Sequence, residues 1–146
     1  MSSSPGSPGC ALGIDVGAAR LGLAASDPGQ TVALPVATLQ RGARDGDAMS
    51  RLTREISERE AAVIVVGLPR QLDGSEGEAA AAARRFATQL GRRTEARVEL
   101  WDERFTTALA ERSLVDAGVR RSRRRQTVDA VAAALILQSW LDSRRR

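Results

Sequence analysis

The stretch that most constrains the fold is AAVIVVGLP, at residues 61–69. Its apolar residues form a continuous run instead of alternating with polar ones. Such a run is typical of a parallel strand that is covered on both faces of its sheet. Parallel strands are joined by crossover connections, which are usually helices. The segment therefore predicts an α/β fold.

The neighbouring segments supply the expected crossovers. Residues 47–59 predict a helix with Met49, Leu52 and Ile56 on one face. Residues 76–90 predict an alanine-rich helix, which Ser75 and Glu78 are expected to begin as a capping box.

The C-terminal third continues this alternation of strands and helices. Residues 97–101 predict a strand, and residues 105–117 predict a helix that stops at Gly118. A last amphipathic helix is expected over residues 126–142, with Val128, Val131 and Leu135 on its buried face and Leu137 or Trp140 as further members.

The N-terminal part predicts antiparallel strands. Residues 11–16 and 20–27 are joined by a short link of small residues, which favours a hairpin, and residues 31–39 supply a third strand. Pro35 indicates that this third strand is an edge or pairs irregularly. We expect a disordered leader at residues 1–10, one domain at 11–142 with a mixed five-stranded sheet flanked by helices, and a basic tail at 143–146.

The missing residue types exclude whole classes of site. There is no histidine, so a Ser-His-Asp triad and histidine metal ligands are excluded. Cys10 is the single cysteine, so neither a disulfide within the chain nor a thiolate zinc site can form. All 22 basic residues are arginine, which also excludes a lysine Schiff base and a standard P-loop. An enzyme of this composition must use carboxylates, hydroxyls, backbone and arginines, together with a hard metal ion.

No membrane segment or signal peptide is expected. The longest apolar run, at residues 130–137, is too short to span a bilayer, and the first nine residues have no basic or apolar stretch. We therefore expect a cytoplasmic protein with no membrane partner.

Three carboxylate positions stand where a site is expected. Asp15 interrupts an apolar strand between Gly13 and Gly17, and Asp102 and Glu103 end the strand at residues 97–101. Asp129 lies in the first turns of the last helix. Each has a local alternative: an Asx turn for Asp15, a helix dipole for the pair, and an i,i+4 ion pair with Arg125 for Asp129. Brought together, they would bind Mg²⁺ or Mn²⁺ in a two-ion site for phosphodiester hydrolysis.

Four motifs together resemble the YqgF/RuvX family: GIDVGAARLGLAASD, VVGLPRQLDGSEGEAA, DERFTT and VDAVAAALILQSWLD. Its members are RNase H-like relatives of the RuvC Holliday-junction resolvase, described as nucleases that process the 5′ end of pre-16S rRNA. The resemblance covers residues 12–142 and implies an RNase H-like fold and a metal-dependent nuclease. It implies Asp15, Glu103 and Asp129 as catalytic and metal-binding acids, with Asp102 as a less certain neighbour. Ala18 and Ala19 depart from the family, in which a hydroxyl and a basic residue are common there.

Arginines are the expected contacts to a nucleic-acid backbone. The resemblance marks Arg20 and Arg104, and an arginine run precedes Asp129, with a solvated charge run as the alternative. The run consists of Arg120, Arg121, Arg123, Arg124 and Arg125. The loop with Gly74, Ser75 and Gly77 is expected as a turn, and as a second role its amides could receive a phosphate. The few aromatic residues look mostly buried, which favours recognition of backbone and shape.

Several functions remain open at this point. The first is cleavage of RNA, with a four-way DNA junction as the alternative substrate; a junction resolvase would act as a dimer, so both monomer and homodimer are kept. A non-catalytic rRNA-binding assembly factor is the second. The third is an ATP-dependent phosphotransferase of the actin and sugar-kinase type, since Asp15, Gly17 and Gly22 match its first phosphate motif. Such enzymes need two domains, and 146 residues supply one.

Overall fold

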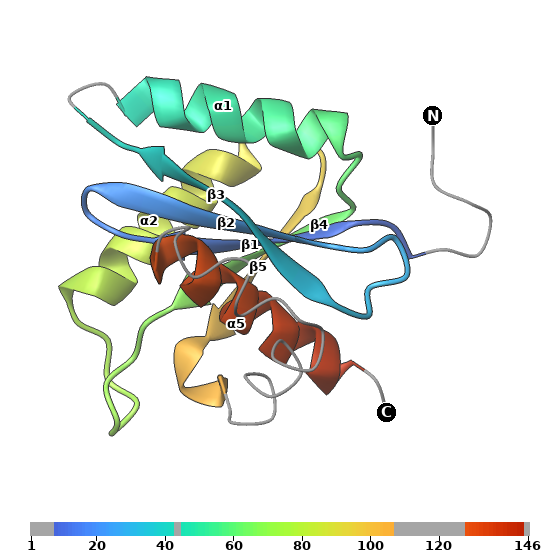
Figure 1. Cartoon of the computed structure of the whole chain (residues 1–146). Coiled ribbons are helices and arrows are strands. Elements are labelled where there is room, and N and C mark those ends of the chain that lie inside the picture. Colours follow the sequence, from blue (N-terminus) through green and yellow to red (C-terminus); the bar gives the residue numbers. More distant parts are fainter. Residues whose placement is uncertain (1–7, 43–44, 107–127, 145–146) are drawn as a thin grey trace.

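The fold is a mixed five-stranded sheet between two layers of helices (Figure 1). A computed structural model describes residues 8–42, 45–106 and 128–144. The strands, in the spatial order β3-β2-β1-β4-β5, are β1 (Ala11–Val16), β2 (Arg20–Ser26), β3 (Ala33–Gln40), β4 (Val63–Leu68) and β5 (Arg97–Asp102). The helices are α1 (Asp45–Glu58), α2 (Glu78–Gly91), the short 3-10 helix η1 (Glu103–Phe105) and α5 (Val128–Ser143). The predicted α/β class and mixed sheet are confirmed.

The strand pairings follow from the sequence pattern. β1, β4 and β5 are parallel to one another, and β4 is buried along its whole length. β1, β2 and β3 form an antiparallel meander with β3 at the edge. The β2–β3 register shifts between Leu23 and Ala24, where Ala24 faces Pro35. The edge and the irregular pairing expected from Pro35 are both confirmed.

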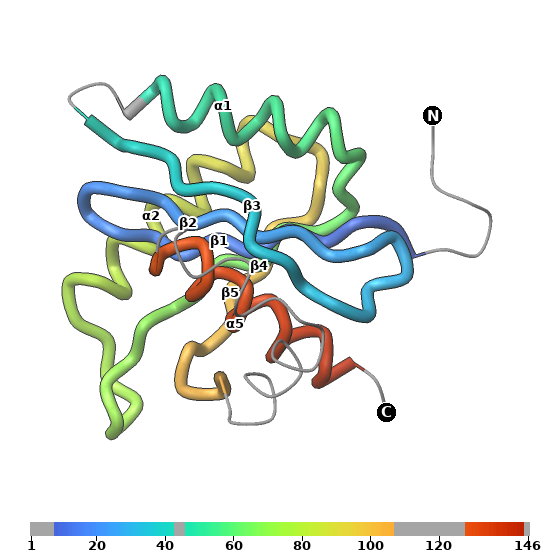
Figure 2. The backbone as a smooth tube through the Cα atoms, viewed as in Figure 1, coloured from blue at the N-terminus to red at the C-terminus, as the bar shows by residue number. Residues whose placement is uncertain are grey.

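Each face of the sheet has its own apolar core. Helices α1 and α2 cover one face, and α5 lies across the other, as the backbone trace also shows (Figure 2). Leu12 and Ile14 of β1 belong to the core under α1 and α2, whereas Ala11 packs with α5. Because side chains alternate along a strand, Gly13 and Asp15 face α5 as well.

Glycines on neighbouring strands let α5 lie close to the sheet. A Cβ atom on Gly13 would stand 2.7 Å from Cβ of Leu137, and one on Gly22 would overlap the carbonyl oxygen of Asp129. Since no side chain can fit in that space, the sequence must place glycine there. The helix that carries Asp129 is thereby fixed against the strand that pairs with β1.

The buried face of α5 differs from the predicted one. Val128 is 84% exposed, whereas Ala130, Ala133 and Ala134 are buried against the sheet. Leu137 and Trp140 are buried as expected. The small alanines face the sheet because α5 approaches its glycines so closely that valine would not fit.

The predicted capping box of α2 is also wrong. The helix begins at Glu78 with Gly77 as N-cap, and no side chain caps it. Ser75 instead bonds to Asp73 through its hydroxyl and its amide, at 2.6 and 2.8 Å. The Asx turn competes successfully for the serine, so the chain enters the helix two residues later than predicted.

Several expected features lie at the limits of the described chain. Gly9 donates a backbone hydrogen bond to Pro28 and Cys10 is half-buried, so these last leader residues belong to the fold. Residues 1–7 and 145–146 lie outside the described residues, as does the predicted helix at 105–117 beyond Thr106. None of the helices described here has the length and apolar character needed to cross a membrane.

Candidate active site

One edge of the sheet collects the candidate acids. The parallel strands β1, β4 and β5 end there, and α5 begins there (Figure 1). The carboxyl ends of parallel strands are where α/β sheets commonly bind ligands. Asp15 lies near the end of β1, Glu103 directly follows β5, and Asp129 is in the first turn of α5.

Side-chain alternation along β5 selects Glu103 over Asp102 as the partner of Asp15. Trp101 faces α5, where its Nε1 donates to Ser139 Oγ at 3.1 Å. The next residue, Asp102, therefore points to the opposite face, and Glu103 returns to the α5 side. A Cβ on Gly67 would lie 2.6 Å from Glu103 Oε2, so the missing side chain leaves the space that this carboxylate occupies. Gly67 follows Val66, whose partner on β1 is Ile14, so Glu103 lies over the strand beside Asp15.

The part-buried carboxylates of Asp15 and Glu103 stand without a counter-charge among the described residues. Neither side chain has a hydrogen-bond or ion-pair partner in that part of the chain. Burial, followed by repulsion from Asp15 and Asp102, raises the pKa of Glu103 to about 7. Burial and then the charge of Asp129 raise the pKa of Asp15 above its ordinary value. Such uncompensated burial is costly in a fold that has no ligand there.

Asp129 reaches the same edge from the other side. Asp15 pairs with Gly22 of β2, and the backbone of Asp129 packs directly on Gly22. The Asp129 side chain accepts a hydrogen bond from Arg20 Nε at 2.6 Å. This hydrogen bond joins residues that are far apart in the sequence. Arg125, the i,i+4 alternative partner of Asp129, lies outside the described residues. Arg20, which was expected to contact a nucleic-acid backbone, instead balances the charge of one acid of the site.

The acids fit a divalent cation in charge and donor type. Carboxylate oxygens are the ligands that Mg²⁺ and Mn²⁺ prefer. Within the described residues, no three acidic or cysteine side chains are gathered tightly enough to hold one ion between them. Asp15 is instead close enough to repel Glu103 and is itself repelled by Asp129, so it belongs to both pairs of acids. This arrangement suits an ion that draws the acids together.

Asp102 has a different role from the other acids. Its side chain, 9% exposed, accepts hydrogen bonds from the backbone and side chain of Arg104, with 2.7 Å to Nη2, and lies 3.6 Å from Arg70 Nη1. The Arg104 hydrogen bond is the largest cause of its lowered pKa. Because its charge is already balanced by two arginines, Asp102 fits a structural anchor better than a metal ligand.

The loop after β4 is held by its own hydrogen bonds. The amide of Gly74 donates to Gln71 and that of Ser75 to Asp73, at 2.8 Å each. These amides are therefore occupied, which disfavours the expected phosphate cradle at Gly74 and Ser75. Gly77 remains only as the N-cap of α2.

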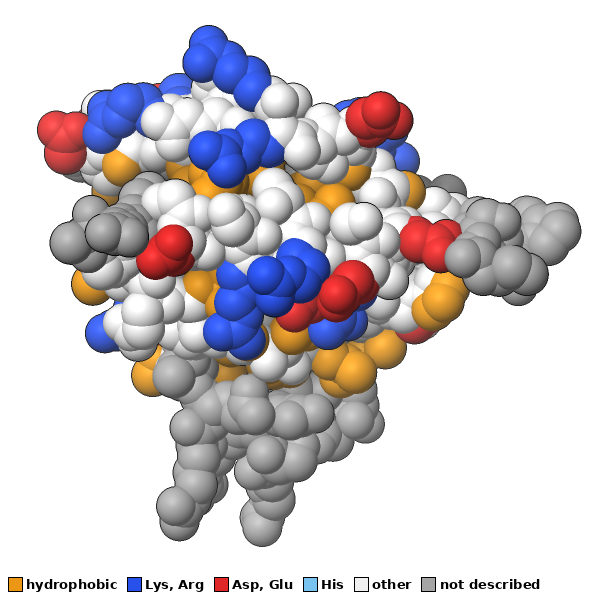
Figure 3. Space-filling view, turned by 90° about the horizontal axis from the view of Figure 1, so that it is seen from above, with side chains coloured by type: hydrophobic (Ala, Val, Ile, Leu, Met, Phe, Trp, Pro, Cys, Tyr) orange, Lys and Arg blue, Asp and Glu red, His pale blue; other side chains and the backbone are white. Residues whose placement is uncertain are grey.

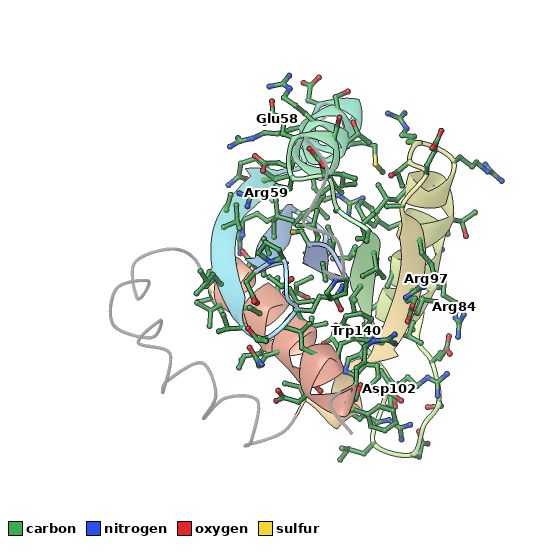
Figure 4. All side chains as sticks on the ribbon, turned by 90° about the vertical axis from the view of Figure 1, so that its right-hand side faces the viewer. Glu58, Arg59, Arg84, Arg97, Asp102 and Trp140 are labelled. Atoms are coloured by element: carbon green, nitrogen blue, oxygen red, sulfur yellow. The ribbon has the colours of Figure 1, made fainter. Side chains whose placement is uncertain are left out.

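Sequence reasoning missed the ion pairs that support this loop. Glu76 accepts from Arg84 at 2.7 Å and lies 3.2 Å from Arg70 Nη2. The acidic residue near the helix start was the only signal, since Arg84 is eight residues away from Glu76 in sequence. Figure 4 shows Arg84 and Arg97 on the side of the molecule formed by α2 and β5, with Asp102 at its lower end.

The α1 side of the molecule is shown in Figure 3. There, arginine and acidic side chains of the described residues are interspersed and form no continuous basic patch (Figure 3). The arginine run at residues 120–125 lies outside the described residues.

The chain is similar to known proteins along almost its whole length. The family model described as "RuvX: Holliday junction resolvase" matches residues 9–143. A Mycobacterium tuberculosis protein named "Putative pre-16S rRNA nuclease" is 50% identical over 134 residues, covering 91% of this chain and 78% of the relative. A Mycobacteroides abscessus protein of the same name is 45% identical over 136 residues, covering 92% and 82%.

Solved structures show the same fold at low sequence identity. Thermus thermophilus RuvC has a TM-score of 0.60 with 18% identity, covering 92% of this chain and 95% of that one. RuvC from the same organism in complex with a Holliday junction substrate has a TM-score of 0.58, with 18% identity and coverage of 92% and 94%. The fold is thus the RNase H-like fold of RuvC, and the chain belongs to the RuvX family.

Proposed function

We propose that this protein is a metal-dependent nuclease that hydrolyses phosphodiester bonds in RNA. The observation that carries the proposal is the pair of unpartnered, part-buried carboxylates, Asp15 and Glu103, beside Asp129 at one edge of the sheet. The names of the relatives supply the substrate, precursor 16S rRNA, and the family resemblance of the sequence adds its 5′ end.

The acids hold the reaction centre. Asp15, Glu103 and Asp129 would bind one or two Mg²⁺ or Mn²⁺ ions, which when bound activate water and stabilise the leaving oxygen. Without a metal ion, the Glu103 carboxyl is partly protonated near neutral pH, because its pKa is about 7. A metal ion would bind the ionised carboxylate, so Glu103 would release that proton on binding. Asp15 interacts with both of the other acids, so it would hold an ion together with either of them.

The arginines shape the surroundings of this centre. Arg20 pairs with Asp129, and the Arg20 side chain is itself 51% exposed, so it can also reach a phosphate. A guanidinium suits this because its planar donors match phosphate oxygens. Recognition of backbone phosphates alone would not need three carboxylates facing a polyanion, so a purely binding role is disfavoured.

A four-way DNA junction is the second candidate substrate. It is supported by the description of the matching family model and by the fold shared with RuvC, which was solved with such a junction. A resolvase cuts two strands symmetrically, which requires a homodimer. The RNA nuclease, in contrast, can act as a monomer.

The test compares cleavage of single-stranded RNA, duplex RNA with the precursor 16S 5′ sequence, and a four-way DNA junction, each with Mn²⁺. We expect RNA cleavage by the wild type, and a loss of at least about 100-fold in Asp15→Asn. Asp47→Asn, an exposed acid on α1, is the matched control and should cleave as the wild type does. Melting temperatures that do not fall below that of the wild type confirm that both variants fold. Full cleavage by Asp15→Asn would refute the proposal, and cleavage of the junction alone would favour the second substrate.

A further inference from the structure

The loop between β4 and α2 presents an exposed leucine at its tip. Leu72 is 96% exposed, more than any other large apolar residue of the described chain, and the loop extends beyond the sheet at the edge that carries the acids (Figure 1). A single exposed leucine is ordinary on a protein surface. What distinguishes Leu72 is how firmly it is mounted, and where.

The loop is a small two-stranded ribbon. Arg70 and Glu76 form an isolated antiparallel bridge, and Gln71 donates to Ser75 at 2.9 Å. The amide of Gly74 donates to Gln71, which closes a turn with Leu72 as its second residue. Gly74 has φ +89°, a conformation that glycine adopts without strain. The backbone of the tip is therefore set by local bonds.

Ion pairs fix this ribbon to the body of the protein. Glu76 is held by Arg84 of α2 and by Arg70, while Arg70 also faces Asp102. Arg104, anchored on Asp102, donates to the Leu72 carbonyl at 3.5 Å. Arg104 is adjacent to Glu103 in sequence, so the tip is tethered directly to the end of the strand that delivers a candidate catalytic acid.

The tip lies beside Arg104, which directly follows Glu103, so a nucleic acid whose phosphate reaches the acids can also reach this tip. Asp102 and its two arginines occupy the polar base of the loop, so the apolar side chain is what the tip itself offers. Leucine is among the side chains that proteins insert between base steps. Of the described aromatic residues, Trp140 and Phe86 are buried and Trp101 packs against α5, while Phe105, 51% exposed, makes an edge contact with Trp101.

We propose that Leu72 contacts the face of an unpaired base in the bound RNA, next to the phosphate that is cleaved. This inference rests on the proposed nuclease function and adds a substrate preference to it. RNA with unpaired or easily unstacked nucleotides at that position is bound in preference to a continuous duplex. In a duplex the base must first be unpaired and unstacked, which costs free energy, whereas an unpaired base avoids most of that cost. Because hydrogen bonds and ion pairs already order the ribbon, it loses less conformational entropy on binding than a loop without them would.

The test measures binding without cleavage, in the Asp15→Asn background, by anisotropy and by fluorescence of 2-aminopurine in the RNA. Two RNAs are compared: a continuous duplex, and the same duplex with unpaired nucleotides that carry the probe. We expect Leu72→Asn to weaken binding of the second RNA by about five- to tenfold and to suppress its fluorescence change, with the continuous duplex unaffected. Leu72→Met, which keeps an apolar side chain of similar size, should keep both the affinity and the fluorescence change of the parent.

The control is Leu34→Asn, which changes another exposed leucine, 43% exposed, on the edge strand β3. It should bind both RNAs as the parent does. Equal affinities of the parent and Leu72→Asn for the RNA with unpaired nucleotides would overturn the inference, and so would an equal loss for both RNAs. Either result leaves the proposed function standing if the wild type cleaves RNA, whereas the absence of cleavage would count against the function alone.

Discussion

Replacing Glu103 with glutamine is expected to stabilise the metal-free protein at alkaline pH while it removes nuclease activity. The structure raises the pKa of Glu103 from 4.5 to about 7, mainly through burial and then through repulsion from Asp15. Glutamine has nearly the same shape but never carries the charge. The substitution therefore removes the cost of burying that charge and also the repulsion on Asp15.

The sign of the pH dependence follows from the raised pKa. Below about pH 4.5, Glu103 is protonated in both the folded and the unfolded protein, and it costs nothing. As the pH rises through 7, the unfolded chain has already released the proton that the folded one retains, so stability falls, and the cost is complete above pH 7. The full difference corresponds to about 3.4 kcal/mol, and because Glu103 is only part-buried, solvent screening reduces it to about 1–2 kcal/mol.

The assay is urea unfolding in EDTA at pH 4 and pH 8, followed by tryptophan fluorescence. Glu103→Gln should exceed the wild type by about 1–2 kcal/mol at pH 8 and match it at pH 4. Glu58→Gln, at the far end of α1 from Asp102 (Figure 4), is the control and should match the wild type at both pH values. A Glu103→Gln variant that is less stable than the wild type at pH 8, or shifted equally at both, would refute the reasoning.

Two further substitutions test how the site is held. Gly22→Ala places a Cβ against the carbonyl of Asp129, so we expect a loss of about 3 kcal/mol in urea unfolding and weaker Mn²⁺ binding in calorimetry. Gly91→Ala, with open space around it, is the control, and an equal loss there would contradict the packing argument. Asp102→Asn should cost about 1–3 kcal/mol by loosening Arg104, with Mn²⁺ affinity unchanged. A tenfold loss of that affinity would make Asp102 a ligand.

The sequence predicted the parts of the fold that depend on local pattern. The continuous apolar run of β4 and the hairpin of β1 and β2 were placed correctly, because strand burial and short links have local signatures. The candidate acids follow from the same pattern, since each stands at a strand end or helix start. That Glu103 shares a face with Asp15 while Asp102 does not was also open to prediction, by counting alternate residues from Trp101.

Other features depend on contacts distant in sequence. The apolar residues of α5 surround the helix, so its period could not tell that alanines face the sheet and Val128 faces outward. The pairing of Arg20 with Asp129 joins residues 109 positions apart, and no local pattern encodes it. Ser75 was open to two bonding modes, a helix cap and an Asx turn, whose energies are too similar for sequence alone to separate.

The central claim is that Asp15, Glu103 and Asp129 form one metal centre. It is tested most directly by the anomalous difference map of a crystal soaked in Mn²⁺. The account predicts a peak at roughly 2.0–2.3 Å from a carboxylate oxygen of Asp15 and of at least one of the other two acids. An occupied Mn²⁺ position elsewhere, with Asp15 still unligated, would contradict it.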